Sequence, residues 1–240
     1  MRVNDFLKWE IEMYKEDDIV ALLKRKDDWN LEELDEFKKE MMSYKCAIRA
    51  VRTKLEVLND ELSMANQRNP IEFVKSRLKK PYSIAQKLRR RGLPLTAQSI
   101  RENLYDVAGV RVVCSFYDDI YKIADMLIKQ DDITLVEVKD YIKRPKPNGY
   151  SSLHLIVRVP IYLSQSKRNV PVEIQIRTIA MDFWATLEHQ MKYKKTMSES
   201  KEVINQLRDC AMRIMQLDED MLNIRKRIDN MAIEEDESYY

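Results

Sequence analysis

Residues 172–177 read VEIQIR, and this strict alternation of apolar and polar side chains is the pattern of a half-buried β-strand. Similar alternation occurs at residues 110–116 and 153–159, and the stretch 135–142 is also predicted as a strand. Helical spacing resumes from Met181. Four strands mixed with helices predict an α/β or α+β core in the middle of the chain.

A long helix is predicted before this core. Apolar residues recur every three or four positions from Leu34 to Leu62, which indicates one amphipathic helix that buries a single stripe. Asn30 and Glu33 resemble a capping pair at the start of this helix, because a short polar side chain there accepts the first free backbone N–H groups. Residues 66–70 are predicted to break the helix.

The last segment has the most regular pattern of the chain. Its apolar residues form a heptad seam made of Val203, Leu207, Cys210, Ile214, Leu217, Met221, Ile224, Ile228 and Met231. Such a seam predicts a coiled-coil-like contact with another copy, and the alternative is a helix that lies on its own domain. The chain therefore divides into a helical segment at 1–69, a central domain at 70–197, and this helix with an acidic tail at 198–240.

The composition excludes several classes of protein. The 240 residues are 45% apolar and 34% charged with a net charge of +2, so the overall charge does not predict nucleic-acid binding. Gly92, Gly109 and Gly149 are the only glycines, and they cannot build a P-loop or a Rossmann fingerprint. The three cysteines have no zinc-ligand spacing. Without a signal-peptide pattern or a membrane-length apolar run, we expect a cytoplasmic protein.

A basic run precedes the predicted sheet. Eight lysines and arginines lie between Lys75 and Arg91. Lys87, Arg90 and Arg91 are three to four positions apart, so they would share one face of a helix. Converging cations on such a face suit a polyphosphate, whereas the members of most charge runs are solvated.

Two carboxylates lie at positions that suit catalysis. Asp106 precedes a predicted strand, and Gly109 beside it would let a ligand approach the backbone closely, which suits a magnesium ligand. A turn or cap residue is the alternative for Asp106. Glu173 lies on the polar side of VEIQIR together with Gln175 and Arg177. This polar stripe is what an active-site floor needs, although a solvent-facing glutamate would give the same pattern.

The loop at residues 144–154 reads RPKPNGYSSLH. Asn–Gly is a strong turn signal, and the prolines stiffen the loop. Tyr150, Ser152 and His154 then fall on one face of the strand that follows. An aromatic ring and an imidazole beside a basic loop suit a nucleotide, whose base stacks on the ring and whose phosphates meet the cations. A hairpin with a surface tyrosine is the alternative.

In chain order these blocks resemble the synthetase domain of the RelA/SpoT alarmone family. The resemblance covers about residues 70–195, in blocks at 77–92, 106–116, 146–154, 172–178 and 180–189. The short length and the helical flanks are most similar to the small alarmone synthetases of the RelP type. The resemblance implies an α+β fold with a mixed-sheet, nucleotidyltransferase-like core, flanked by N-terminal helices and the long C-terminal helix. It also favours a homotetramer over a dimer.

The activity implied by the resemblance is that of a GTP pyrophosphokinase. Such an enzyme transfers the β,γ-pyrophosphate of ATP to the 3′-hydroxyl of GDP or GTP, which makes AMP and the stringent-response alarmones ppGpp and pppGpp. No membrane or nucleic acid is required. The chain has no His–Asp pair, so the hydrolase activity of longer family members is not expected. The alternatives are a catalytically silent nucleotide-binding module and a helical scaffold.

The resemblance also implies a role for each residue of the site. ATP would be bound by Arg77 and Arg111 around the adenine and by Lys79, Lys87 and Arg90 on the phosphates. GDP or GTP would be bound by Tyr150 on the guanine, by Lys146 and His154 on the phosphates, and by Asn148, Lys139, Gln175 and Arg177. Asp106 would bind Mg²⁺, and Glu173 would be the general base or a second metal contact. Lys139 and Asp182 depart from the Arg and Asn of some relatives.

Overall fold

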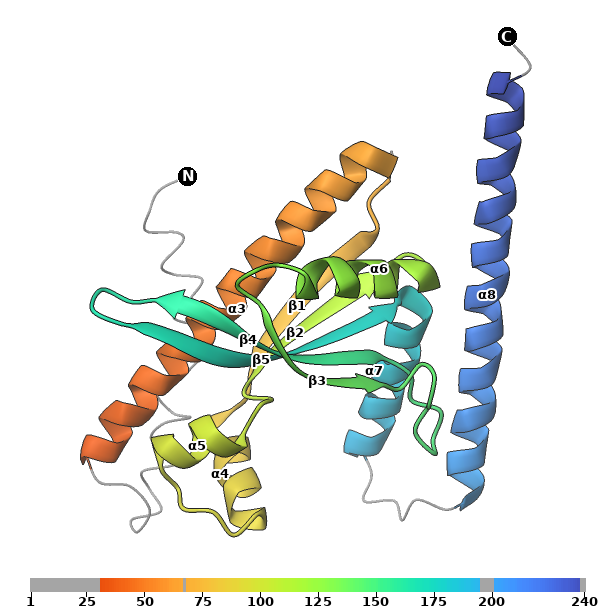
Figure 1. Cartoon of the computed structure of the whole chain (residues 1–240). Helices are drawn as coiled ribbons and strands as arrows, with labels where there is room; N and C mark the ends of the chain where they lie inside the picture. The colour runs from red at the N-terminus through yellow and green to blue at the C-terminus, as the bar shows by residue number, and fades with distance from the viewer. Residues whose placement is uncertain (1–30, 67, 195–200, 238–240) are drawn as a thin grey trace, which may run out of the picture.

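Helices and strands are mixed along the chain, which confirms the predicted α+β class (Figure 1). The structure, a computed structural model, describes residues 31–66, 68–194 and 201–237. Its elements are α3 (Leu31–Asn66), β1 (Ile71–Leu78), α4 (Pro81–Arg90), α5 (Ala97–Asn103), β2 (Ala108–Cys114), α6 (Tyr117–Ile128), β3 (Thr134–Asp140), β4 (Leu153–Tyr162), β5 (Lys167–Thr178), α7 (Ile179–Lys194) and α8 (Lys201–Glu237). The predicted capping residue Asn30 lies outside the described residues.

The five strands form one sheet in the order β1-β2-β5-β4-β3. Strands β2 and β5 are parallel, and the other neighbouring pairs are antiparallel. Helix α3 crosses the sheet diagonally, whereas α4, α5 and α7 lie below it in Figure 1. The mixed sheet therefore has one face that is covered by a long helix and one that is open between shorter elements.

One hydrophobic core joins α3 to the covered face. The predicted stripe of α3 is buried along its length, through Phe37, Met41, Tyr44, Ile48, Val51, Leu55, Leu58 and Leu62. The same cluster contains Val110 and Val112 of β2 and Ile174 and Ile176 of β5. Burial of each large apolar side chain contributes roughly 1.5–3 kcal/mol. Because apolar residues on these strands face α3, the residues between them face the open side.

The prediction of four strands was wrong, because β1 adds a fifth at the edge of the sheet. This strand contains Lys75 and Arg77, which belong to the basic run that the sequence placed before the sheet. Among its eight residues only Ile71 is buried. An edge strand tolerates charged side chains because one side of it faces solvent. The apolar alternation that identifies a half-buried strand is therefore weak in β1.

Three local predictions also change. Arg91 follows the end of α4 and donates a hydrogen bond to the Asn103 carbonyl at 2.6 Å, so it does not join the predicted phosphate-facing cluster. Strand β2 ends before Phe116, which is the N-cap residue of α6. Strand β3 ends at Asp140, because the Asp140 carboxylate accepts a hydrogen bond from the N–H of Ile142 at 3.0 Å and so forms a turn.

Helix α8 lies beside α7 and α6 and uses only part of its predicted seam there (Figure 1). Leu207 and Ile214 are half-buried next to Trp184, and Ala211 and Leu222, which are not seam residues, are buried. The seam residues from position 217 onward remain 49–61% exposed: Leu217, Met221, Ile224, Ile228 and Met231, called the α8 stripe below. The helix thus docks on its own domain and leaves the α8 stripe uncovered in the single chain.

No helix of the described ranges is long and apolar enough to span a membrane.

Candidate active site

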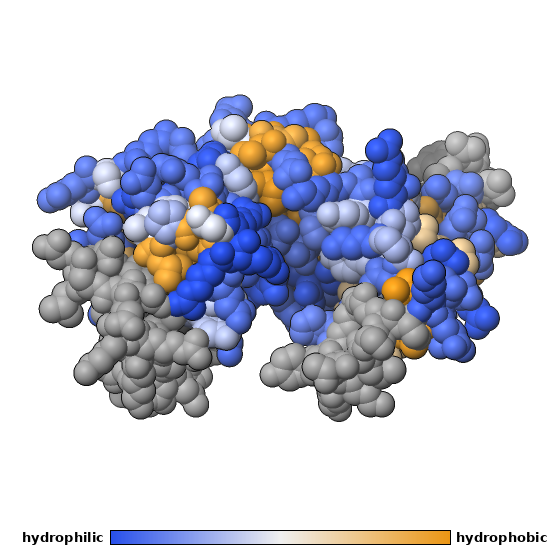
Figure 2. Space-filling view, turned by 90° about the horizontal axis from the view of Figure 1, so that it is seen from below, coloured by the Kyte–Doolittle hydropathy of each residue, from blue (hydrophilic) through white to orange (hydrophobic). Residues whose placement is uncertain are grey.

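Polar side chains gather on the open face of the sheet. The strand register aligns Lys75, Arg111, Gln175, His154 and Lys139 in one row across all five strands. The adjacent row contains Arg77, Gly109, Glu173 and Ile156. Paired positions of neighbouring strands point to the same face, so most of the predicted site residues meet here. Figure 2, viewed from below, shows a hollow with hydrophilic walls on this side of the molecule.

The predicted ATP side lies over β1 and β2. A cavity of about 160 Å³ is lined by Lys75, Ser76, Arg77, Gly109, Val110, Arg111 and Gln175, and is called the β1–β2 pocket below. Gly109 suits this position, because a Cβ would lie 3.3 Å from Cγ of Arg77. The Arg77 side chain can therefore lie across β2. Two planar guanidinium groups at one pocket are suited to the faces of a flat aromatic base.

The lysines predicted to bind phosphate converge on Asp106. Nζ of Lys79 and Nζ of Lys87 donate hydrogen bonds to Oδ2 of Asp106 at 2.5 and 2.6 Å. Burial alone would raise the pKa of Asp106, but the two lysine hydrogen bonds lower it below its usual value. The carboxylate is therefore ionised at neutral pH. Arg90 and Lys87 also line a cavity of about 480 Å³ beside α4, which extends the basic surface.

The other oxygen of Asp106 suits a metal ion. Oδ1 is buried and has no hydrogen-bond partner within the described part of the chain. A buried acceptor without a partner costs free energy and is uncommon in folded proteins. Carboxylate oxygens are preferred ligands of Mg²⁺, which usually takes further ligands from water and substrate phosphates. No group of three or more His, Cys, Asp or Glu residues within the described ranges could enclose a metal by itself.

The loop before β4 is held by an internal hydrogen bond, by α7 and by α8. The Asn148 side chain accepts a hydrogen bond from the N–H of Tyr150 at 3.2 Å and donates one to Glu188 at 3.0 Å. Gly149 has a φ of +89°, which a residue with a Cβ rarely adopts. A Cβ at this position would also lie 2.5 Å from Cβ of Ala211. Glycine therefore allows α8 to pack directly against this turn.

A chain of polar contacts runs from Arg177 to Glu173. Nη2 of Arg177 donates a hydrogen bond to the Tyr150 hydroxyl at 2.5 Å, and this hydroxyl lies 2.8 Å from Nε2 of His154. Nδ1 of His154 lies 3.4 Å from Oε1 of Glu173. Burial lowers the pKa of His154, so the ring is neutral at neutral pH. All three contacts are satisfied when Tyr150 donates to Nε2 and Nδ1 carries the proton.

Glu173, at the end of this chain, is a partly buried and ionised carboxylate. Burial alone would raise the pKa of Glu173, but the hydrogen bonds from His154 and Gln175 lower it. The Gln175 amide donates to Oε2 of Glu173 at 3.0 Å. A carboxylate that is ionised at neutral pH can accept a proton from a hydroxyl group or bind a cation.

The Tyr150 ring belongs to a cluster of aromatic and cationic groups. Nζ of Lys146 lies 4.7 Å from the ring centroids of both Tyr141 and Tyr150. Tyr141 also packs edge-on against His154, with ring centroids 5.1 Å apart. Tyr141 is not indicated by the sequence pattern, because it follows β3 in a stretch that is predicted only as a strand. The cluster offers a ring for stacking and a cation that can move to a phosphate.

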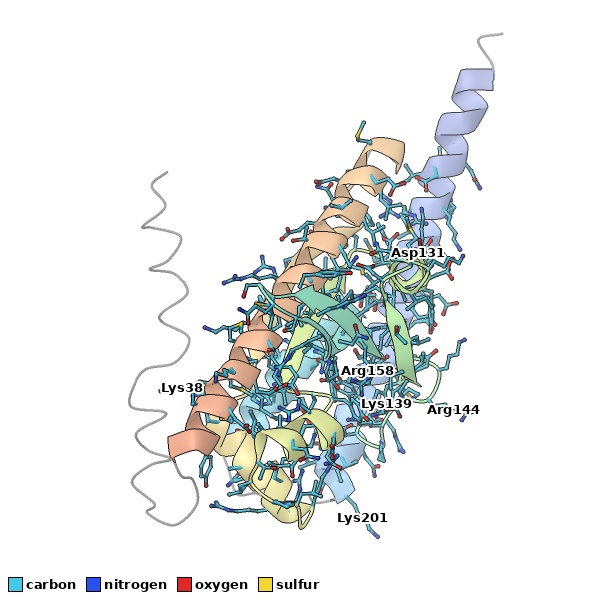
Figure 3. All side chains as sticks on the ribbon, turned by 60° about the vertical axis from the view of Figure 1, so that its left-hand side comes forward. Lys38, Asp131, Lys139, Arg144, Arg158 and Lys201 are labelled. Carbon is cyan, nitrogen blue, oxygen red and sulfur yellow. The ribbon has the colours of Figure 1, made fainter. Side chains whose placement is uncertain are left out.

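Some residues of the predicted site lie at its rim. Lys139 is on the edge strand β3 and forms an ion pair with Glu137 at 3.0 Å. Arg144, from the same predicted loop as Lys146, projects outward in Figure 3. Asp182, noted in the sequence only as a departure from relatives, is buried and forms ion pairs within the site. Its partners are distant or on another element, so no local pattern could have indicated these contacts.

Comparison with known proteins gives the family. The family described as "Region found in RelA / SpoT proteins" matches residues 76–198. GTP pyrophosphokinase YwaC from Bacillus subtilis is 44% identical over 196 residues, which cover 82% of this chain and 93% of that protein.

Solved structures agree with the sequence match. Small alarmone synthetase 2 from Bacillus subtilis superposes with a TM-score of 0.72 at 45% identity, over 80% of this chain and 99% of that chain. Small alarmone synthetase 1 from the same organism, bound to its product pppGpp, has a TM-score of 0.73 at 36% identity, over 80% and 97%. Bound to AMPCPP, it has a TM-score of 0.68 at 34% identity, over 82% and 99%. With sequence, fold and site in agreement over most of its length, this chain belongs to the RelA/SpoT family.

Proposed function

We propose that this chain is a GTP pyrophosphokinase, which transfers the β,γ-pyrophosphate of ATP to the 3′-hydroxyl of GDP or GTP and releases AMP. The observation that carries the proposal is the position of Glu173 on the open face of the sheet. This carboxylate lies in the same row as Arg77 of the β1–β2 pocket and contacts His154, the neighbour of Tyr150. In this proposal the donor and the acceptor nucleotide therefore meet at one ionised carboxylate. The names of the relatives and the pppGpp and AMPCPP complexes support this reading.

The donor nucleotide occupies the β1–β2 pocket in this proposal. Arg77 and Arg111 hold the adenine between them, which uses stacking and cation–π attraction. Lys79, Lys87 and Arg90 hold the phosphates. Because Lys79 and Lys87 already pair with Asp106, they turn part of their hydrogen bonding to the phosphates when ATP binds.

The acceptor nucleotide binds beside the loop at 146–150. Tyr150 stacks on the guanine, and Lys146 leaves the tyrosine rings for a phosphate. Lys139, Gln175 and Arg177 extend this side of the floor, and Asn148 keeps the loop in shape. The 3′-hydroxyl then faces Glu173, which takes its proton as the oxygen attacks the β-phosphorus of ATP. The neutral His154 keeps the Glu173 carboxylate in place through its Nδ1–H.

Asp106 would hold Mg²⁺ through its unpartnered Oδ1, with Glu173 as the possible second contact on the same face. When bound, the ion would neutralise charge on the ATP phosphates. The cations of the site serve the same purpose, because pyrophosphate transfer depends mainly on the stabilisation of phosphate charge.

A direct assay tests the proposed activity. Purified protein is incubated with ATP, Mg²⁺ and either GDP or GTP, and the products are separated by anion-exchange chromatography. We expect equimolar AMP and ppGpp or pppGpp, and the two rates give the acceptor preference. Nucleotide binding without AMP formation would instead support a silent binding module, and no binding at all would support a scaffold.

We also propose that the protein is a homo-oligomer, with a tetramer favoured by the family resemblance. The support from this chain is the α8 stripe, whose five large apolar side chains are about half exposed. Helix α7 carries a second exposed apolar row, Ile179, Phe183, Leu187 and Met191. Contiguous apolar surface of this kind usually marks an interface.

A charge in the middle of the α8 stripe tests the assembly. Leu217→Glu should give smaller particles in light scattering with an unchanged circular dichroism spectrum. Asn205→Glu, an exposed α8 position outside the stripe, is the control and should keep the native mass. A wild-type protein that is monomeric at micromolar concentration would end the proposal.

Cytoplasmic location and the RelP type stay predictions, the former supported by three free thiols.

A further inference from the structure

One buried carboxylate joins the two sides of the site. Asp182 lies in the first turn of α7 and is 7% exposed. Its Oδ1 lies 3.1 Å from Nη1 of Arg111 and 3.2 Å from Nη1 of Arg177. Within the described part of the chain, Asp182 is the only carboxylate that forms an ion pair with either arginine.

The two arginines need such a partner. Arg111 and Arg177 lie on the neighbouring parallel strands β2 and β5, two register positions apart on the same face. Like charges in a partly buried site repel each other more strongly than in water. Burial and the charge of Arg177 both lower the pKa of Arg111. A shared carboxylate offsets this repulsion and fixes the distance between the two guanidinium groups.

Each arginine serves a different nucleotide. Arg111 lines the β1–β2 pocket, where the proposed function places ATP. Arg177 donates a hydrogen bond to the Tyr150 hydroxyl at 2.5 Å and lies 5.1 Å from the ring centroid of Tyr150, where the proposed function places guanine. Movement of the Asp182 carboxylate would therefore displace groups on both sides of Glu173.

We propose that Asp182 is a positioning residue that orients Arg111 for the donor nucleotide and Arg177, through Tyr150, for the acceptor nucleotide. This role rests on the proposed assignment of the two pockets. Asp182 itself does not touch the reacting atoms. The competing explanation is that Asp182 only stabilises the start of α7, because a carboxylate in the first turn of a helix interacts favourably with the helix dipole.

A second aspartate of the chain separates these explanations. Asp119 also lies in the first turn of a helix, α6, and is also buried. It accepts two hydrogen bonds from Arg68 at 2.7 and 2.8 Å. Among the described residues, no ion pair or hydrogen bond joins Asp119 to Arg111, Arg177 or Tyr150. Asp119→Asn is therefore a matched loss of a buried, first-turn ion pair outside the site.

The experiment measures two dissociation constants by calorimetry with Mg²⁺ present, one for AMPCPP and one for GDP, in the full-length protein. Asp182→Asn keeps the side-chain shape and removes the charge, and we expect both dissociation constants to rise, each by roughly 2- to 30-fold. Asp182→Ser should give the same double effect, which covers the case in which one variant folds poorly. Asp119→Asn should leave both constants within about twofold while it lowers the melting temperature.

Three outcomes overturn the proposal. In the first, Asp182→Asn and Asp182→Ser lower only the melting temperature, as Asp119→Asn does. In the second, only one of the two nucleotides binds more weakly. In the third, Asp119→Asn weakens both nucleotides as strongly as the Asp182 variants. The binding experiment does not depend on turnover. A wild-type protein that makes no AMP would refute the proposed function, and the two dissociation constants would still test the role of Asp182.

Discussion

The two faces of β5 differ in chemistry although their residues alternate along one strand. Val172, Ile174 and Ile176 are fully buried against the core that contains α3. Glu173 and Arg177, on the open face, are also largely buried, but each is held by hydrogen bonds to other polar groups. The covered face is thus stabilised by shape and burial, and the open face by matched donors, acceptors and charges.

This difference determines how each face responds to substitution. An apolar face loses free energy of unfolding when a side chain is shortened, because a cavity remains. A polar face loses function first, because its charged groups are arranged for ligands and for one another. The predictions below test this contrast, in order of expected size.

The largest effect is expected at the polar face, on catalysis. Glu173→Gln keeps the shape of the side chain and removes the ionised base, so kcat should fall by about 10²- to 10⁴-fold. Denaturant unfolding should show a nearly unchanged fold. A titration with Mg²⁺ then separates the two roles of Glu173: recovery of the rate at high Mg²⁺ would identify a metal contact, and a persistent loss would identify the base. A variant with near-native kcat at ordinary Mg²⁺ would remove Glu173 from the site.

Ile174, the residue after Glu173, should affect stability and not catalysis when it is substituted. Ile174→Ala removes a fully buried side chain from the α3 face and should cost about 2–5 kcal/mol of unfolding free energy. The KM values per folded molecule should stay close to the wild type, since Ile174 points away from both pockets. Urea unfolding followed by circular dichroism gives the free energy. A large rise in either KM with native stability would contradict the separation of the two faces.

A smaller effect is expected where α8 meets the loop at 146–150. Gly149→Ala adds a Cβ at a φ of +89° and 2.5 Å from Cβ of Ala211. Backbone strain of this kind costs on the order of 1–3 kcal/mol, and it should appear mainly as a higher KM for GDP or GTP. Adding Ala211→Gly should recover the part of the loss that comes from the contact with Ala211. It should leave the part that comes from φ and from Cα of Arg208, which lies 3.0 Å from the added Cβ. A change in the KM for ATP alone would show that α8 does not support the acceptor side.

The smallest effect is expected at Asp218 of α8, which accepts a hydrogen bond from Thr178 at the end of β5 at 2.6 Å. Burial raises the pKa of Asp218, and the Thr178 hydrogen bond only partly opposes this. A raised carboxyl pKa favours the folded state below the unfolded pKa, and this contribution is lost as the pH rises through the folded pKa. Asp218→Asn should remove that dependence, so its unfolding free energy should gain on that of the wild type between pH 4 and pH 7. If the unfolding free energies of the variant and the wild type had the same pH profile, the prediction would be wrong.

Local patterns in the sequence predicted much of this molecule. The α3 stripe, the alternation in β2, β4 and β5, and the long last helix all depend on spacing within one segment, and spacing is a local property. Asp106, Glu173 and Tyr150 were predicted as site residues from their local patterns, and the resemblance to the RelA/SpoT family then implied a role for each. Their assigned roles remain proposals for the experiments above.

Other features follow only from the tertiary structure. Strand β1 was missed because an edge strand with lysine and arginine lacks apolar alternation. The row from Lys75 to Lys139 exists only through the register of five strands, whose members come from positions 75 to 175 of the chain. The sharing of Asp182 by Arg111 and Arg177 depends in the same way on where α7 begins relative to β2.

The sequence by itself therefore determined which residues of β2, β4 and β5 are apolar or polar, and so which face of these strands lies against the core. Only the tertiary structure decided which polar residues meet, and which face of α8 docks on its own domain while the α8 stripe remains exposed. The physical reason is that periodicity is set by neighbouring residues, whereas register and docking are set by the packing of segments that the chain brings together from a distance.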